Sequence, residues 1–395
     1  MKRVYLDHGA TTVVDKRVLE EMLPYFTEDF GNASSLHSFG QKAQDALSRS
    51  RKAVADMIGS TPDEIVFNSG GSEGDNHAIK GVAYHNLHTR AREHGKGKRF
   101  HIITTAIEHP AVSRTCEYLE NTGFDITYLP VDDKGLIDLA ELEGAIRSET
   151  ILISIMFANN EIGTIQDIKA IGEITIKHDV VFHTDAVQAL GKVPIDVNEL
   201  NIDLMSMSSH KLHGPKGVGA LYIRKGTKIE PLIHGGGHEG GQRSSTENIA
   251  GIVGFAKACE IAGDGMSEEI KRMSAQRDRI IEGILGRIPD SFLNGHPQHR
   301  LPNNVNVGIR YVEGESMLLH LDMMGIGVST GSACSSKSLK ASHVLTAIGV
   351  KPEDAHGSLR ITLGRFTTDE EIDYLLENLP KIVEKLRALS PLGRV

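Results

Sequence analysis

Cysteine is scarce in this sequence, with three residues among 395. Cys116, Cys259 and Cys334 are far apart, odd in number and outside any CxxC or zinc-type spacing. A disulfide framework and a cysteine-based zinc site are therefore not expected. Such cysteine usage fits a reducing compartment, so we expect a cytoplasmic protein.

Long hydrophobic runs are missing as well. The longest clean apolar stretch, 151–158, is far too short to span a bilayer, and the N-terminus has no apolar signal core. The formal net charge of -9 at pH 7 argues against a general affinity for nucleic acid or anionic membranes. We therefore expect partners to include neither nucleic acid nor membrane.

Short apolar runs of strand length alternate with helical patterns through the first two thirds of the chain. The runs are 65–67, 101–105, 151–158, 180–184, 204–208 and 218–223. Strands that alternate with helices predict an α/β fold with a mostly parallel sheet covered on both faces.

The pattern of short apolar runs ends near Gly263-Asp264-Gly265. A long charged helix is expected to follow, over roughly 267–288. The chain length exceeds the usual size of one hydrophobic core, so two domains are expected. We predict a large domain over residues 20–262 and a smaller α+β domain made of 1–19 and 263–395.

In parallel sheets, ligands bind at the carboxyl ends of the strands. The first run leads into Asn68-Ser69-Gly70-Gly71-Ser72 and then a helical pattern. Backbone N–H groups of a glycine turn and of a helix N-terminus can bind a phosphate, and Ser72 adds a hydroxyl. The P-loop lysine is absent. A plain glycine turn that caps a helix is the alternative.

Polar side chains also follow three other runs. His109 could stack on a ligand, although a hydrogen-bonded loop histidine is the alternative. The amides of Asn159 and Asn160 could contact ligand oxygens or satisfy a turn. Asp185 ends an apolar strand, where a carboxylate is costly unless paired, and a pyridinium N–H is a good partner; a helix N-cap is the alternative role. Gln188 would lie on the same side of a helix that starts there.

Lys211 follows the run 204–208, within Ser208-Ser209-His210-Lys211. A lysine partly shielded from water suits covalent chemistry with a carbonyl group, and a surface lysine in a loop is the alternative. These features together are the components of a pyridoxal 5'-phosphate site: an anion cradle, a stacking ring, an amide, a carboxylate and a lysine.

The sequence resembles the cysteine desulfurases of the NifS/IscS class, which are class V aminotransferase-like, fold type I enzymes. The matching segments span the chain: 5–7 with 10–12, 31–37, 243–246, 329–336 and 359–366. The resemblance implies a pyridoxal-phosphate enzyme that converts L-cysteine to L-alanine.

The resemblance also implies the catalytic and substrate-binding roles. Lys211 holds the cofactor and moves protons at the substrate's α-carbon. Cys334 attacks the substrate sulfur and becomes a persulfide. His109 stacks on the cofactor ring and acts in proton transfer. Asn160 and Arg360 bind the substrate carboxylate, and Asn160 also contacts the cofactor.

The remaining implied roles concern cofactor binding. Asp185 pairs with the pyridine nitrogen and Gln188 with the ring hydroxyl. Thr246 reaches the phosphate in the neighbouring subunit's site, which implies a homodimer. Within one subunit, the phosphate is held by Gly71, Ser72, Ser208 and His210.

The expected sulfur acceptor is an iron–sulfur scaffold or another acceptor protein. A selenocysteine lyase or another class V enzyme is an alternative function, and a non-catalytic sulfur-relay subunit is a second. No metal site is expected, because HExxH is absent and Gly235-Gly236-Gly237 between His234 and His238 opposes a ligand-presenting helix.

Overall fold

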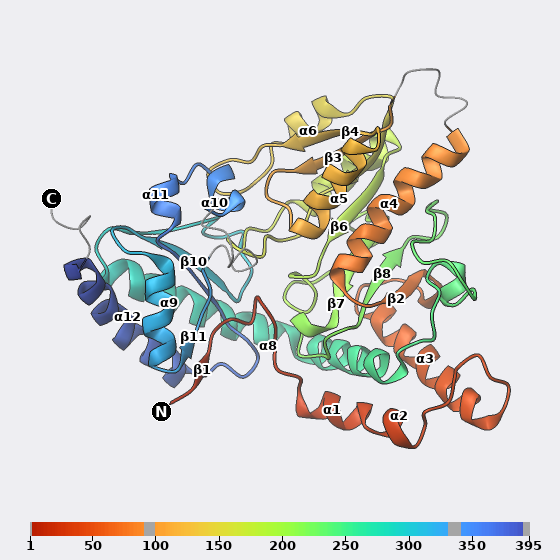
Figure 1. The fold of residues 1–395 in the computed structure, drawn as a ribbon, viewed down its shortest axis with the longest axis horizontal. Coiled ribbons are helices and arrows are strands. Elements are labelled where there is room, and N and C mark those ends of the chain that lie inside the picture. Colours follow the sequence, from red (N-terminus) through yellow and green to blue (C-terminus); the bar gives the residue numbers. More distant parts are fainter. Residues whose placement is uncertain (1, 91–98, 331–340, 390–395) are drawn as a thin grey trace.

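A seven-stranded sheet forms the centre of the larger part of the molecule (Figure 1). The computed structural model describes residues 2–90, 99–330 and 341–389. The strands are β2 (Ile65–Asn68), β3 (His101–Thr105), β4 (Asp125–Leu129), β5 (Thr150–Ser154), β6 (Val181–Asp185), β7 (Leu204–Ser208) and β8 (Gly219–Ile223), in the order β2-β8-β7-β6-β5-β3-β4. The strand β8 runs in the opposite direction to the other six strands of this described sheet. The predicted α/β fold with a mostly parallel sheet is confirmed.

Helices cover both faces of this sheet. One face is covered by α4 (Gly71–Arg90) and α5 (Pro110–Asn121), the other by α3 (Ser38–Asp56), α6 (Leu139–Ala145), α7 (Ile168–His178) and part of α8 (Ile249–Arg287). Successive side chains of a strand point to opposite faces of the sheet. Ile102 therefore packs against α4 and α5, whereas Ile103 packs on the opposite face, in the core to which α3 contributes. Both side chains are fully buried.

A smaller unit holds the C-terminal elements and the start of the chain. Its antiparallel sheet has the order β12 (Ser358–Thr362), β10 (Asn304–Ile309), β9 (Ser291–Leu293), and β1 (Val4–Tyr5) pairs in parallel with β11 (Ile326–Gly327). Its helices are α9 (Gly314–Met323), α10 (His343–Ala347), α11 (Pro352–Ala355) and α12 (Asp369–Leu389). After β1 the chain crosses to the larger part and forms α1 (Lys16–Met22) and α2 (Pro24–Thr27) (Figure 1). Three single turns of 3₁₀ helix complete the described elements: η1 (Pro62–Glu64), η2 (Ser209–Lys211) and η3 (Glu239–Gly241).

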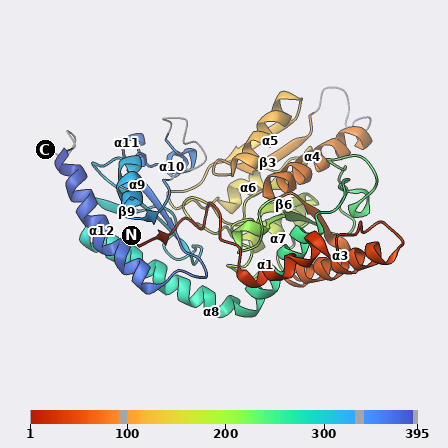
Figure 2. The same ribbon diagram turned by 60° about the horizontal axis from the view of Figure 1, so that its bottom comes forward.

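The helix α8 runs along both units (Figure 2). Its first half places Phe255 and Cys259 in the core of the large sheet, and its second half places Ile280 and Ile284 in the core of the smaller unit. The helix expected near residue 267 therefore begins at Ile249. A glycine inside a helix costs only about 1 kcal/mol, and packing at both ends offsets that cost. The predicted domain boundary at 262/263 lies inside this helix and stays a prediction.

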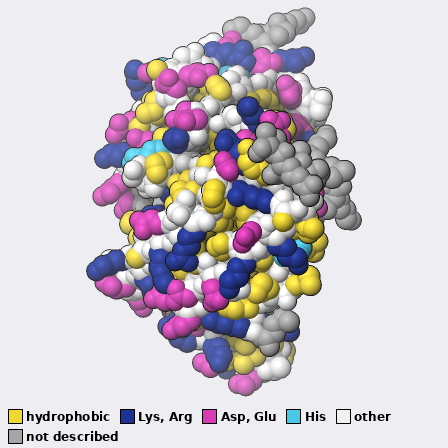
Figure 3. Space-filling view, turned by 90° about the vertical axis from the view of Figure 1, so that its left-hand side faces the viewer, with side chains coloured by type: hydrophobic (Ala, Val, Ile, Leu, Met, Phe, Trp, Pro, Cys, Tyr) yellow, Lys and Arg dark blue, Asp and Glu magenta, His cyan; other side chains and the backbone are white. Residues whose placement is uncertain are grey.

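The end of the molecule formed by the smaller unit carries basic and acidic side chains interspersed, with hydrophobic ones between them (Figure 3). Leu319 and Met323 of α9 are exposed. None of the described helices is long and apolar enough to cross a membrane.

Candidate active site

One cavity of about 280 Å³ collects residues from the carboxyl ends of the parallel strands. Its lining includes ten of the predicted site residues: Gly71, Ser72, His109, Asn160, Asp185, Gln188, Ser208, His210, Lys211 and Arg360. They follow or end β2, β3, β5, β6 and β7, and Arg360 comes from β12 of the smaller unit. The two units thus build one site.

The N-terminus of α4 forms one end of the cavity. Gly71 and Ser72 open this 20-residue helix and line the cavity, and N–H groups in a first helical turn have no intrahelical partner. A Cβ at Gly74 would lie 3.0 Å from Ser206 Oγ, so glycine lets the helix approach β7 closely. His210 Nδ1 lies 3.1 Å from Thr11 Oγ1, and burial lowers the pKa of His210 to about 4. This end therefore offers neutral donors and a helix dipole to an anion.

Asp185 and His109 form the middle of the cavity. Asp185 ends β6 and its Oδ1 accepts a 2.9 Å hydrogen bond from the Val187 N–H. Burial raises the pKa of Asp185, while the nearby His109 and Lys211 oppose this rise. The helix expected after Asp185 is a turn over 187–192, yet Gln188 still lines the cavity. Asp185 therefore caps no helix at this point.

His109 is the N-cap of α5, and its Nδ1 accepts a 3.1 Å hydrogen bond from the Ala111 N–H. The neutral ring therefore carries its proton on Nε2. Burial lowers the pKa of His109, so the neutral form predominates at pH 7.

The N-terminal segment holds Lys211 in place. Lys211 Nζ donates to the carbonyl oxygens of Gly9 at 2.6 Å and Ala10 at 2.8 Å. Gln188 Nε2 donates to the same Gly9 carbonyl at 3.1 Å. Gly9 and Ala10 line the cavity but were not predicted as site residues. Only the family resemblance drew attention to the segment 5–12, because nothing in its own sequence predicts a contact with Lys211.

Arg360 supplies the cationic wall and is 3% exposed. Its Nη1 donates to the Asn160 carbonyl at 3.0 Å, and its Nη2 to Asp7 Oδ1 at 2.9 Å. Its Nε is buried without a hydrogen-bond partner. A guanidinium in this setting suits a small carboxylate, which it can bind with two parallel hydrogen bonds.

Comparison with known proteins identifies the family. The family model for aminotransferase class-V matches residues 4–375. The chain belongs to this family. Cysteine desulfurase IscS of Methanosarcina thermophila is 57% identical over 99% of this chain and 94% of its own length. Cysteine desulfurase IscS 1 of Archaeoglobus fulgidus is 50% identical over 99% of each chain.

Solved structures with the same fold are similar to this chain over most of its length. A NifS-like protein has a TM-score of 0.90 and 41% identity over 98% of this chain and all of its own. A structure of SspA in complex with cysteine has a TM-score of 0.78 and 38% identity over 92% of this chain and 100% of its own. The class-V family implies pyridoxal phosphate as cofactor.

The chemistry of the cavity fits pyridoxal phosphate. The α4 N-terminus suits the phosphate, the buried carboxylate of Asp185 suits a protonated ring nitrogen, and the Lys211 amine suits the aldehyde. The carboxyl oxygen Asp75 Oδ1 and the Arg360 Nε are buried without partners, as expected where polar ligands complete the site. When bound, this cofactor supplies an electron sink for the substrate's α-carbon.

Two predicted residues are not among the described residues that line this cavity. Thr246 is exposed and outside the lining of the cavity. Cys334 lies outside the described residues. Conversely, the buried acids Asp75 and Glu108 were not predicted. Asp75 lies one helical turn after Gly71, which places both on the same side of α4; this spacing was the available signal. Burial raises the pKa of Glu108 to about 8.

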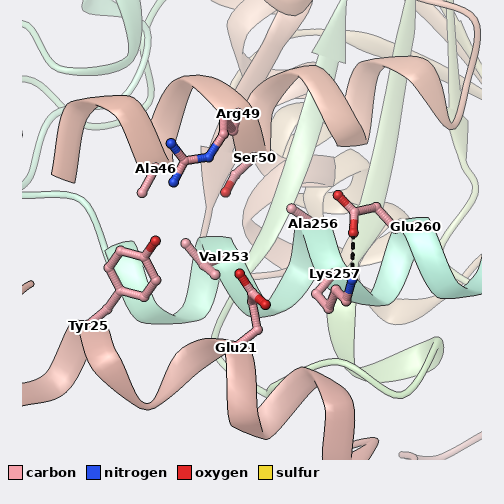
Figure 4. A pocket seen from close by; sticks show the side chains of 9 residues that line it. All are labelled: Glu21, Tyr25, Ala46, Arg49, Ser50, Val253, Ala256, Lys257 and Glu260. Atoms are coloured by element: carbon pink, nitrogen blue, oxygen red, sulfur yellow. Dashed lines mark hydrogen bonds and ion pairs between the residues drawn. The ribbon is translucent and has the colours of Figure 1, made fainter. Parts of the chain in front are cut away.

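A second, smaller cavity contains none of the predicted residues. It measures about 90 Å³ and lies between α1, α2, α3 and α8 (Figure 4). Its charged residues include Glu21, Arg49, Lys257 and Glu260, and Lys257 Nζ already pairs with Glu260 Oε2 at 3.0 Å. We assign the chemistry to the cavity of about 280 Å³, because that cavity is lined by the predicted site residues.

Proposed function

We propose that the protein is a cysteine desulfurase that converts L-cysteine to L-alanine and an enzyme-bound persulfide for iron–sulfur cluster assembly. The observation that carries this proposal is the single cavity that joins Lys211, Asp185 and Arg360. The cysteine desulfurases at 50% and 57% identity support it.

Each residue then has a defined task. Arg360 and Asn160 bind the carboxylate of L-cysteine and orient its α-carbon toward Lys211. The Lys211 amine accepts the α-proton and returns a proton to the product. His109, neutral and protonated on Nε2, stacks on the ring and exchanges a proton at the substrate.

Cys334 completes the reaction as the sulfur acceptor. Its thiolate attacks the substrate sulfur, the S–S bond of the persulfide forms, and the C–S bond breaks with its electron pair left on the substrate's β-carbon. Protonation of that carbon yields alanine. Because atoms and charge balance, no external oxidant is required.

The proposal extends to the assembly. We assign a homodimer in which Thr246 reaches the phosphate in the neighbouring subunit's site, because Thr246 is exposed and outside its own cavity. We also assign an iron–sulfur scaffold or another sulfur-acceptor protein as the partner, and the cytoplasm as the location.

The direct test is to add L-cysteine and a thiol reductant to the purified, cofactor-loaded protein and to measure sulfide and alanine. We expect both products in equal amounts. Cysteine binding without either product would overturn the proposal and favour another class V reaction.

Arg360→Lys is expected to raise the KM for L-cysteine by about 10- to 100-fold, with a smaller effect on kcat. Lysine keeps the charge but loses the planar fork that binds a carboxylate with two hydrogen bonds. Initial rates over a range of cysteine concentrations measure both constants. Arg310→Lys is the matched control, because Arg310 is exposed and pairs with Asp354. A KM within about twofold of wild type would remove Arg360 from substrate binding.

A further inference from the structure

A second carboxyl group lies beside Asp185 in the cofactor cavity. Asp75 of α4 lines this cavity and is 1% exposed. Its Oδ1 is buried and has no hydrogen-bond partner. Buried carboxyl oxygens without partners are rare, because an ionised carboxylate loses its hydration there. The protonation state of the Asp75 carboxyl group therefore matters for the part of the site that would bind the cofactor ring.

A chain of polar side chains across the sheet reaches Asp75. Ser154 Oγ lies 2.9 Å from His183 Nδ1, and His183 Nε2 lies 3.0 Å from Ser206 Oγ. Ser206 in turn lies beside the Asp75 carboxyl group and favours its charged form. Burial lowers the pKa of the fully buried His183 to about 3, so this ring is neutral and donates from one nitrogen only.

The direction of this chain follows from its donors. A carboxyl group that accepts from Ser206 uses the serine proton, so the Ser206 oxygen accepts from His183 Nε2–H. His183 Nδ1 then accepts from the Ser154 hydroxyl. The chain therefore turns the Ser206 hydroxyl toward Asp75, whereas Asp75 Oδ1 accepts no hydrogen bond and lies 3.7 Å from His183 Nε2.

Asp75 and Asp185 are too close to ionise together. One side-chain atom from each of Asp75, Asp185 and His109 lies within 4.8 Å of the other two. Two buried carboxylates at such a separation hold one proton between them, because like charges repel strongly in a low dielectric.

The surroundings decide which carboxyl group holds the proton. Asp185 accepts the Val187 N–H and lies near the Lys211 amine, both of which favour its charge. Asp75 has only the neighbouring Ser206 hydroxyl to favour its charge, and the nearby acids Asp185 and Glu108 oppose that charge. Burial and these acids place the pKa of Asp75 well above its usual range.

We propose that Asp75 is the protonated partner of Asp185, a positioning residue that leaves one negative charge, on Asp185, facing the ring nitrogen of the cofactor. This inference rests on the proposed pyridoxal-phosphate chemistry. With a second negative charge, the pair would carry one charge more than a single ring N–H can neutralise. A proton on Asp185 would instead remove the ionic partner of that nitrogen.

Infrared difference spectroscopy of the resting, cofactor-loaded protein tests the proposal. The spectrum of wild type minus Asp75→Asn at pH 7.5 is expected to contain the C=O stretch of one protonated carboxylic acid per chain, and no carboxylate band. Asp133→Asn is the matched control, because Asp133 has 76% of its side chain exposed, and its difference spectrum should contain carboxylate bands only. Carboxylate bands for Asp75 would overturn the proposal.

Cofactor affinity gives an independent readout. Asparagine mimics the uncharged acid, so Asp75→Asn should bind pyridoxal phosphate within about threefold of wild type, whereas Asp185→Asn should weaken binding by about 10- to 100-fold through loss of a charged hydrogen bond. Equal weakening in both variants would overturn the proposal.

Ser206→Ala covers the case in which Asp75→Asn does not fold. It keeps Asp75 and removes the neighbouring hydroxyl that favours its charge, so the band of the protonated acid should shift in frequency. An unchanged spectrum would count against the proposal. These spectra require no turnover, so a failed desulfurase assay would leave the test of Asp75 intact.

Discussion

Lys211→Ala is expected to lower kcat for L-cysteine by at least about 10³-fold and to remove the visible absorbance of the lysine-bound cofactor. Lys211 lines the cavity, its Nζ is held by two carbonyl oxygens, and it belongs to the 3₁₀ turn η2 that directly follows β7. Alanine leaves neither the covalent attachment nor the proton carrier. The measurements are the absorbance spectrum and the rates of sulfide and alanine release.

Lys216→Ala is the control for this variant. Lys216 is exposed, five residues further along the chain, and does not line the cavity. Its spectrum and rate should match those of wild type. If Lys211→Ala retained both the absorbance and turnover, another residue would hold the cofactor, and the assignment of Lys211 would be wrong.

Cys334→Ser is expected to keep cofactor absorbance and cysteine binding but to lose sulfide release by at least about 10³-fold. A serine hydroxyl is a poor nucleophile at neutral pH and cannot form a stable persulfide. The measurement uses cysteine with isotopically labelled sulfur and follows label on the protein under non-reducing conditions.

The remaining cysteines supply the matched control. Cys116 and Cys259 are buried, and burial raises the pKa of the Cys116 thiol to about 12 and raises that of Cys259 further. A variant with both replaced by alanine keeps Cys334 as its single cysteine and should still take up label. Labelling of Cys334→Ser at the wild-type level would show that another residue accepts the sulfur. Sulfide release by this variant at the wild-type rate, without label on the protein, would contradict the persulfide mechanism and favour a lyase.

The sequence predicted the strands because their apolar character is local. Runs such as 101–105 and 204–208 are buried on both faces, so a continuous apolar pattern marks them. The strand β4 was missed, since Asp125–Leu129 lies at the sheet edge and is mostly half-buried, with polar residues among the apolar ones. The early start of α8 was missed because packing at both ends outweighs the glycines near residue 263.

For the site, too, the sequence predicted only what a local pattern indicates. Residues that follow strands, such as Asp185 and Lys211, could be predicted because chain order places them at one edge of a parallel sheet. The contacts of Lys211 with Gly9 and Ala10 join segments about two hundred residues apart, for which no local pattern exists. Asp75 resembles an ordinary polar residue on a helix, and only its burial shows otherwise.

The pairing of Asp7 with Arg360 has a consequence for biosynthesis. These residues lie 353 positions apart, and β1 pairs with β11 late in the chain. The ribosome therefore makes one side of this cavity wall at the outset and the other near the end. A nascent chain that already contains the entire large sheet still lacks the Arg360 guanidinium, so the cavity of a stalled translation product has no cationic wall, however well its sheet has formed.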